Sequence, residues 1–289
     1  MKIASYLSDG AAVYGAVTSS GLVTASSGFR SAYPTLRAVL IGGALPELAR
    51  DTAGRVSDAT TEAVSFLPPI HDAGKIICVG VNYQKRYPLD APQPTPEQIF
   101  LFAKFPGALV AHREALELPR GEAAKSFDYE GEIVVVIGKP GRHIPEEHAM
   151  DYVAGFTLMN DGSVRGWQKH SVHAGKNFAR SGACGPWMVT ANEITETSKI
   201  QLTTKLNGEI VQNATLAELI HPLAKVIAYA SHIGDLEAGD LIAMGSPEGS
   251  GGSRTPPRFL LAGDEVEVSS PEIGVLRNCV GASQHGNRR

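Results

Sequence analysis

The 289-residue sequence has few cysteines, no excess of basic residues and no long apolar run, and each shortage excludes a class of protein. Its three cysteines (Cys78, Cys184 and Cys279) are too few and too widely spaced for a disulfide framework or a zinc site, which indicates a reducing compartment. Lys and Arg number 26 against 30 Asp and Glu. No basic cluster occurs, so nucleic acid is not an expected partner.

No apolar run approaches the length of a membrane span, and the first residues lack the hydrophobic stretch of a secretory signal. The phosphate-binding patterns G-x-x-x-x-G-K-[ST] and G-x-G-x-x-G do not occur, so nucleotide binding has no support. We therefore expect a soluble, cytoplasmic protein with neither membrane nor nucleic acid as a partner.

The sequence does contain an acidic pattern that leads into an apolar strand, in residues 126–138 (SFDYEGEIVVVIG). Period-2 alternation before a β-branched run predicts a strand that enters the core. Glu130 and Glu132 should share one face of it, about 7 Å apart. Neighbouring carboxylates are costly to bury unless a hard cation such as Mg²⁺ or Ca²⁺ binds them. Taken alone, the pattern more often marks the solvent face of a half-exposed strand.

A third oxygen ligand strengthens the metal interpretation. Residues 152–161 predict a second strand, which ends at Asp161. The segment that follows supplies Arg165 and Gln168, and Lys176 comes shortly after. Cations and amides beside a metal held by carboxylates indicate a site for an anionic, oxygen-rich substrate.

Seven segments between residues 74 and 280 resemble, in chain order, the fumarylacetoacetate hydrolase family. They are DYEGE, AGFTLMNDGSVRGWQ, GKNF, GPWMVT, LIAMGSPEG, PPRFLLAGDEVEV and IGVLRN. The resemblance implies a divalent metal, usually Mg²⁺ with Mn²⁺ or Ca²⁺ as alternatives, held by Glu130, Glu132 and Asp161. It also implies that the substrate is a small 2-oxo acid, often an acylpyruvate, and that the protein is a homodimer.

The expected elements are mostly strands with a few helices and no regular alternation of the two, which favours an α+β fold. Residues 1–70 predict a small N-terminal α/β appendage, with a three-stranded meander followed by a helical stretch. Residues 71–283 are the expected catalytic core, which the resemblance implies is a rolled, mixed β-sheet. Residues 284–289 should form a frayed tail. Residues 216–233 predict a long amphipathic helix.

The predicted site suits enolate chemistry. A metal that binds the carboxylate and keto oxygens of a 2-oxo acid stabilises the adjacent enolate. We expect Lys176 to stabilise the developing negative charge. Arg165 and Gln168 are expected to bind the substrate's carboxylate, or to orient the metal's ligands. Tyr83 and Ser246 are expected to line the substrate pocket.

One position departs from the family pattern. Many members have N-Y-x-x-H where this chain has NYQKRY, and the histidine of that pattern activates water. The matching residue here is Arg86, and an arginine cannot act as a general base at neutral pH. Replacement bases are His112, His170 and His173. Alternatively, Arg86 binds a substrate carboxylate and a water or metal-bound hydroxide is the base. The proline-rich residues 83–97 predict a lid.

These features predict a metal-dependent hydrolase that cleaves a C–C bond in an acylpyruvate or a fumarylacetoacetate-like compound of a catabolic pathway. The missing histidine favours an alternative, a lyase or isomerase such as an oxaloacetate-type decarboxylase, a hydratase or a keto–enol tautomerase. A third possibility is a non-catalytic binding protein, which the three acids around one pocket argue against.

Overall fold

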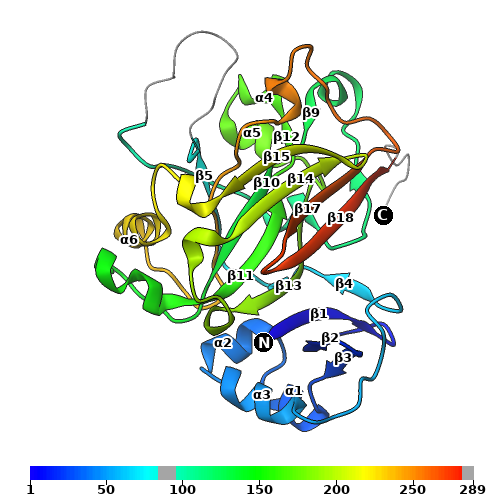
Figure 1. The fold of residues 1–289 in the computed structure, drawn as a ribbon, viewed down its shortest axis with the longest axis vertical. Helices are drawn as coiled ribbons and strands as arrows, with labels where there is room; N and C mark the ends of the chain where they lie inside the picture. Colours follow the sequence, from blue (N-terminus) through cyan, green and yellow to red (C-terminus); the bar gives the residue numbers. More distant parts are fainter. Residues whose placement is uncertain (84–95, 282–289) are drawn as a thin grey trace.

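A mixed sheet of eleven strands forms the centre of the molecule in the computed structural model, which describes residues 1–83 and 96–281 (Figure 1). The strand order is β3-β2-β1-β13-β11-β10-β16-β5-β6, with β4 added to β1 and β7 to β13. The strands are β1 (Lys2–Ser8), β2 (Ala11–Thr18), β3 (Gly21–Thr24), β4 (Ser65–Leu67), β5 (Ile76–Gly80), β6 (Phe100–Ala103), β7 (Leu109–Val110), β10 (Gly131–Ile137), β11 (Val153–Asn160), β13 (Gly182–Thr190) and β16 (Leu241–Ala243).

A second, smaller sheet packs against the large one. Its order is β15-β14-β17-β18-β8, and β9 and β12 form a separate pair. These strands are β8 (Leu116–Glu117), β9 (Phe127–Asp128), β12 (Ser163–Val164), β14 (Gln201–Leu206), β15 (Glu209–Thr215), β17 (Glu265–Ser270) and β18 (Gly274–Gly281). Ile133 and Val135 of β10 belong to the same buried cluster as Leu202 and Val268 of the smaller sheet, so the main core lies between the two sheets.

The opposite face of the large sheet packs against helices from the N-terminal segment. Val134 and Val136 of β10 share a buried cluster with Leu36 and Leu48 from two of these helices. The predicted meander extends the same sheet, because β1 pairs with β13 in the antiparallel sense. Residues 1–70 are therefore joined to the rest of the chain through both hydrogen bonds and apolar contacts.

The helices are short. The α-helices are α1 (Ser27–Ala32), α2 (Leu36–Ile41), α3 (Leu45–Thr52), α4 (Arg165–Gln168), α5 (Val172–Lys176) and α6 (Leu223–Ile233). The 3-10 helices are η1 (Pro106–Ala108), η2 (Gly121–Ser126), η3 (Glu146–Tyr152), η4 (Ala191–Glu193), η5 (Thr197–Lys199), η6 (Leu216–Glu218) and η7 (Gly251–Ser253). Among the described residues, none of the helices is long and apolar enough to cross a membrane.

The long helix predicted for residues 216–233 is divided. A 3-10 turn, η6, comes first, and α6 starts only after Pro222. Proline has no amide hydrogen to donate and disfavours helical geometry in the residue before it, so Pro222 interrupts the helix. The apolar periodicity of the sequence continues across this interruption. The strand-rich α+β architecture itself is confirmed. Arg86, most of the predicted lid and the C-terminal tail lie outside the described residues.

Candidate metal and substrate site

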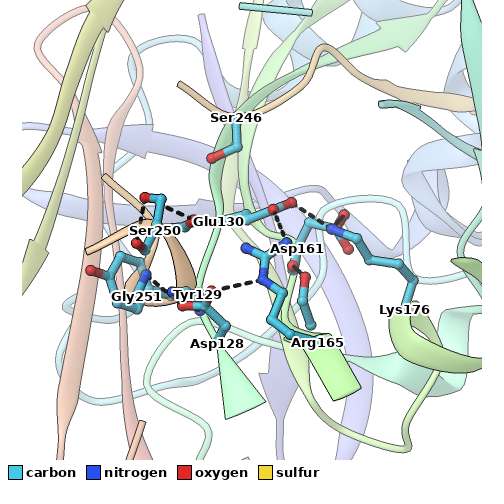
Figure 2. A network of polar contacts seen from close by, with 12 residues as sticks. Asp128, Tyr129, Glu130, Asp161, Arg165, Lys176, Ser246, Ser250 and Gly251 are labelled. Carbon is cyan, nitrogen blue, oxygen red and sulfur yellow. Dashed lines mark hydrogen bonds and ion pairs between the residues drawn. The ribbon is translucent and has the colours of Figure 1, made fainter. Parts of the chain in front are cut away.

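Three carboxylates converge at one end of the large sheet. Figure 2 shows two of them, Glu130 and Asp161, beside the Lys176 side chain. Glu130 lies directly before β10 and Glu132 within it, and Asp161 directly follows the neighbouring strand β11. The pairing of these strands brings Asp161 beside Glu130, whose carbonyl accepts a 2.7 Å hydrogen bond from the Asp161 amide. One carboxylate oxygen of each residue lies within 4.8 Å of the others, and the residues are only 8%, 1% and 0% exposed.

Close packing against the smaller sheet explains why a glycine, Gly131, lies between the two glutamates. A Cβ atom on Gly131 would lie 2.0 Å from Oγ1 of Thr204, which belongs to β14 of the smaller sheet. Any side chain at position 131 would therefore force the Thr204 side chain to move. The E-G-E sequence places two carboxylates on one face of β10 while its other face stays in close contact with the second sheet.

Two buried lysines and one arginine bind two of these carboxylates, Glu130 and Asp161. The Lys176 Nζ lies 2.5 Å from Glu130 Oε2 and 2.6 Å from Asp161 Oδ2. The Lys104 Nζ lies 2.6 Å from the other oxygen of Asp161, and Arg165 Nη1 lies 2.6 Å from Glu130 Oε1. Burial alone would lower the pKa of Lys176, but the charges of Asp161 and Glu130 outweigh it and raise that pKa above its ordinary value. Lys176 is therefore an ammonium.

Arg165 is itself held by a fourth carboxylate, Asp128. Its Nε lies 2.7 Å from Asp128 Oδ2 (Figure 2). The same carboxylate accepts hydrogen bonds from the amides of Gly251 and Gly252, at 2.7 and 2.9 Å. A Cβ at position 251 would lie 2.0 Å from the carbonyl oxygen of Arg258, so this close approach requires glycine. Asp128 thus fixes both the arginine and the C-terminal glycine-rich loop.

We expect Asp128→Asn to lower the free energy of unfolding by about 2–3 kcal/mol, because charged hydrogen bonds are lost and the new amide N–H groups face other donors. Urea unfolding measures this difference. Asp151→Asn, at an exposed position on η3, is the matched control and should change little. Equal stability of the two variants would show that Asp128 does not hold the loop.

Glu132 has no side-chain cation as a hydrogen-bonding partner within the described part of the chain. Its Oε2 accepts a 2.8 Å hydrogen bond from the amide of Gly245, a residue with φ of +93°. Burial, together with the charges of Asp161 and Glu130, raises the pKa of Glu132 well above its usual range, although Lys176 and the Gly245 amide oppose this. Its carboxylate therefore lacks a partner that matches its charge.

The donor set fits a hard divalent cation. Among the described residues, four carboxylates and three cations form one connected network, and this set carries one surplus negative charge when all are ionised. The three converging ligands are all oxygen atoms, which Mg²⁺, Mn²⁺ and Ca²⁺ prefer. Glu130, Glu132 and Asp161 would hold such an ion, and it would supply the positive charge that Glu132 lacks.

The structure describes both residues that were predicted to line the substrate pocket, Tyr83 and Ser246. The buried hydroxyl of Tyr83 has no hydrogen-bond partner among the described residues, and Tyr83 helps to line a pocket of about 610 Å³ together with Pro247 and Gly249. Ser246 Oγ accepts a 2.8 Å hydrogen bond from Gln212, whose Oε1 accepts one from the Gly131 amide. The Ser246 loop is therefore bonded to the E-G-E segment itself.

Gln168, which was predicted to bind the substrate or to orient the metal's ligands, packs beside the residue that precedes Lys176. A Cβ on Gly175 would lie 2.3 Å from Gln168 Cγ, so the glutamine side chain covers the residue that precedes Lys176. α4 carries Gln168 and Arg165, and α5 carries Lys176, so the two helices pack together at the site.

Comparison with known proteins identifies the family. Residues 75–281 match the family model described as fumarylacetoacetate (FAA) hydrolase C-terminal. The chain belongs to the fumarylacetoacetate hydrolase family. It is 36% identical over 221 residues to the mitochondrial oxaloacetate tautomerase fahd2 of Xenopus laevis, which covers 75% of this chain and 68% of that protein. It is 33% identical over 234 residues to the oxaloacetate tautomerase YisK of Bacillus subtilis, which covers 80% of this chain and 77% of that protein.

The fold is that of solved structures in which the whole chain is matched. A maleylpyruvate hydrolase from Sphingobium sp. SYK-6, solved with manganese(II) and pyruvate, superposes with a TM-score of 0.81 at 21% identity and covers 98% of this chain and all of that one. At 21% identity, this similarity establishes a shared fold and nothing about the reaction. The family and the fold predicted from the sequence are both confirmed.

The three histidines proposed as replacement bases lie apart from the carboxylates of this family member. His112 packs edge-on against Phe66, and its Nδ1 accepts a 3.1 Å hydrogen bond from the Arg277 amide. His170 and His173 are exposed, and their rings pack against Trp167 and Phe105. The partners of these rings are therefore Phe66, Trp167, Phe105 and the Arg277 amide, none of which is a predicted metal ligand.

We expect His112 to affect acid stability. Burial, followed by the charges of Arg113 and Arg277, lowers its pKa from 6.5 to about 4. As the pH falls, His112 is therefore protonated in the unfolded chain before it is protonated in the folded protein. The contribution of neutral His112 to the free energy of unfolding is complete above pH 6.5 and is lost between pH 6.5 and about 4. His112→Asn, which keeps an acceptor for the Arg277 amide, should reduce that loss by on the order of 1 kcal/mol. Urea unfolding between pH 4 and 7 tests this, and an unchanged slope would contradict it.

Sequence reasoning missed two residues of this site, Lys104 and Asp128. Asp128 was visible as the first acid of the alternating run, but its partners Arg165 and Gly251 come from distant segments. Lys104 is a single lysine after the apolar strand β6, and only its complete burial marks it as a site residue.

Proposed function

We propose that this member of the fumarylacetoacetate hydrolase family is a divalent-metal-dependent tautomerase that interconverts the enol and keto forms of oxaloacetate or a similar 2-oxo acid. The observation that carries the proposal is the buried cluster of Glu130, Glu132 and Asp161 with the Lys176 ammonium against two of its members. The relatives at 33–36% identity named as oxaloacetate tautomerases support the choice of reaction.

Tautomerisation needs only a proton transfer. A C–H bond at the carbon beside the keto group breaks while an O–H bond forms on the former keto oxygen, and no water is consumed. A bound Mg²⁺ or Mn²⁺ supplies polarisation of that oxygen. The protein must bind the substrate's carboxylate, orient the reacting carbon and carry the proton.

The side chains have unused donors for the first of these tasks, binding of the substrate's oxygens. An ammonium has three N–H donors, and Lys176 Nζ uses two of them on Glu130 and Asp161. The third is available to an oxygen of the substrate, where it would stabilise developing negative charge. The buried Nη2 of Arg165 has no acceptor among the described residues, which suits a substrate carboxylate.

Hydrolysis of an acylpyruvate is the second candidate, and it was the first expectation from the sequence. The maleylpyruvate hydrolase of the same fold, solved with manganese(II) and pyruvate, keeps it in consideration. A hydrolase must also activate water, and Arg86 at the family's usual histidine position cannot do so. Tautomerisation requires no such base and is therefore favoured. The homodimer, the cytoplasmic location and the native ion stay predictions.

Turnover on a panel of 2-oxo acids tests the proposal. Purified protein is treated with a chelator, divided, and assayed with and without Mg²⁺ or Mn²⁺ on enol oxaloacetate and on an acylpyruvate, with pyruvate release monitored. We expect metal-dependent loss of the enol and a kcat/KM for C–C cleavage at least about 10-fold lower. Faster cleavage than tautomerisation would make the protein a hydrolase, and turnover of neither would reject both functions.

A further inference from the structure

The segment after strand β6 is bonded to the end of helix α5, which carries Lys176. The Nζ of Lys104 donates to the carbonyl oxygen of Lys176 at 2.6 Å, as well as to Asp161 Oδ1 at 2.6 Å and the Gly162 carbonyl at 3.2 Å. One buried ammonium thus joins the Asp161 ligand to the backbone of the catalytic lysine, across a sequence separation of 72 residues.

A reciprocal contact runs in the other direction. Asn177, the residue after Lys176, accepts a 2.6 Å hydrogen bond from the Phe105 amide and donates a 3.1 Å bond to the Ala103 carbonyl. These two groups flank Lys104 in the chain. The side chain of Lys104 therefore binds the backbone of Lys176, and the side chain of Asn177 binds the backbone on both sides of Lys104. The ring of Phe105 also packs against His173 of α5, with centroids 4.8 Å apart.

The hydrogen-bonding capacity of Lys104 shows what it does. Its three donors meet three acceptors, and its side chain is 0% exposed. It therefore has no N–H group left for a substrate, in contrast to Lys176, which uses two donors in the site. Asn177 likewise directs its recorded hydrogen bonds to backbone groups and to His173, away from the carboxylates.

We propose that Lys104 and Asn177 are positioning residues that lock α5 onto the end of β6 and so fix the Lys176 ammonium between Glu130 and Asp161. α5 has only five residues, too few to be a stable helix by itself, so its place depends on contacts of this kind. This proposal rests on the proposed function only where it is tested by kcat and KM. Hydrogen exchange of the α5 amides can be measured without substrate.

The test compares Lys104→Met and Asn177→Ala with the wild-type protein by hydrogen exchange of residues 172–177 and by kcat and KM for oxaloacetate tautomerisation. We expect the α5 amides to exchange at least about 10-fold faster in both variants. kcat should fall by roughly 10-fold or more, as is usual when a residue that orients a catalytic group is lost, while KM stays within about threefold. Asn177→Ala removes no buried charge, so it remains informative if Lys104→Met does not fold.

Lys75→Met is the matched control. Lys75 also pairs with a buried carboxylate, Asp240, at 2.9 Å, but it lies at the start of β5. It should lower thermal stability and leave α5 exchange and kcat unchanged. Unchanged α5 exchange in Asn177→Ala would overturn the proposal. So would an Mn²⁺ affinity that falls more than about 10-fold in Asn177→Ala, since Asn177 would then act on the metal ligands. If wild-type protein fails to turn over oxaloacetate, the proposed function fails, while the exchange data still decide this inference.

Discussion

Glu132→Gln should weaken binding of Mg²⁺ or Mn²⁺ by more than about 100-fold and should stabilise the metal-free protein. Changes to residues that only orient a metal ligand already cost roughly 10–100-fold in affinity, and this change removes the charge of a ligand itself. In the metal-free protein, the same carboxylate is buried beside Asp161 and Glu130, and no side-chain cation in residues 1–83 and 96–281 hydrogen-bonds to it. Glutamine fills the same volume without that charge, so we expect a gain of about 1–3 kcal/mol at neutral pH.

The pH dependence of that gain has a definite sign. The pKa of Glu132 is raised in the folded protein, so its contribution to stability is fully present below the unfolded pKa and is lost as the pH rises through the folded pKa. The advantage of Glu132→Gln should therefore grow from pH 4 towards pH 8 in chelator-treated protein. Calorimetric titration with Mn²⁺ and urea unfolding measure the two effects.

Glu267→Gln provides the opposite control. Glu267 is also buried, but hydrogen bonds from Arg277 and Lys205 outweigh burial and lower its pKa. Its replacement should destabilise the protein and leave metal affinity unchanged. If Glu132→Gln behaved like Glu267→Gln in both measurements, Glu132 would be a structural carboxylate and the metal interpretation would be wrong.

Lys176→Met should reduce kcat by about 10²–10⁴-fold, the range typical for loss of a group that transfers a proton or stabilises developing charge. Mn²⁺ affinity should be retained or increased, because the change removes a cation that contacts Glu130 and Asp161. Methionine keeps most of the length and volume of lysine. The prediction therefore separates loss of chemistry from loss of the metal site.

Single-turnover kinetics and an Mn²⁺ titration on the same sample measure these two quantities. Lys75→Met again serves as the control for removal of a lysine paired with a buried acid. A parallel loss of kcat and Mn²⁺ affinity would show that Lys176 maintains the metal site. An unchanged kcat would exclude Lys176 from catalysis.

The convergence of Glu130, Glu132 and Asp161 was predictable because its signal is local. The alternation of Glu130 and Glu132 requires only the period of a strand, and Asp161 follows an apolar run that ends beside it. The predicted same-face arrangement is what the structure shows. The partners of these acids come from tertiary contacts: Lys104 reaches Asp161 across 57 residues, and Arg165 reaches Asp128 across 37. The spacing of apolar and polar residues along the sequence does not indicate which distant residues will be in contact.

Two further features were hidden for related reasons. β1 pairs with β13, more than 180 residues further along the chain, so the continuity of the large sheet could not be read from the N-terminal segment. The apolar spacing of residues 216–233 continues through Pro222, although the helix does not. The positions of His112, His170 and His173 likewise depend on the fold, since each is a single histidine without a surrounding pattern.

Anomalous diffraction from crystals grown with Mn²⁺ and oxalate, a chelating mimic of an enolised 2-oxo acid, shows directly whether the three acids bind a metal ion. We expect one strong manganese peak bonded by carboxylate oxygens of Glu130, Glu132 and Asp161, with oxalate completing the ion's ligands and Lys176 in contact with an oxalate oxygen. Carboxylate–manganese distances of about 2.0–2.3 Å would agree with this assignment. A manganese peak elsewhere, or no peak beside these three residues at saturating Mn²⁺, would contradict it.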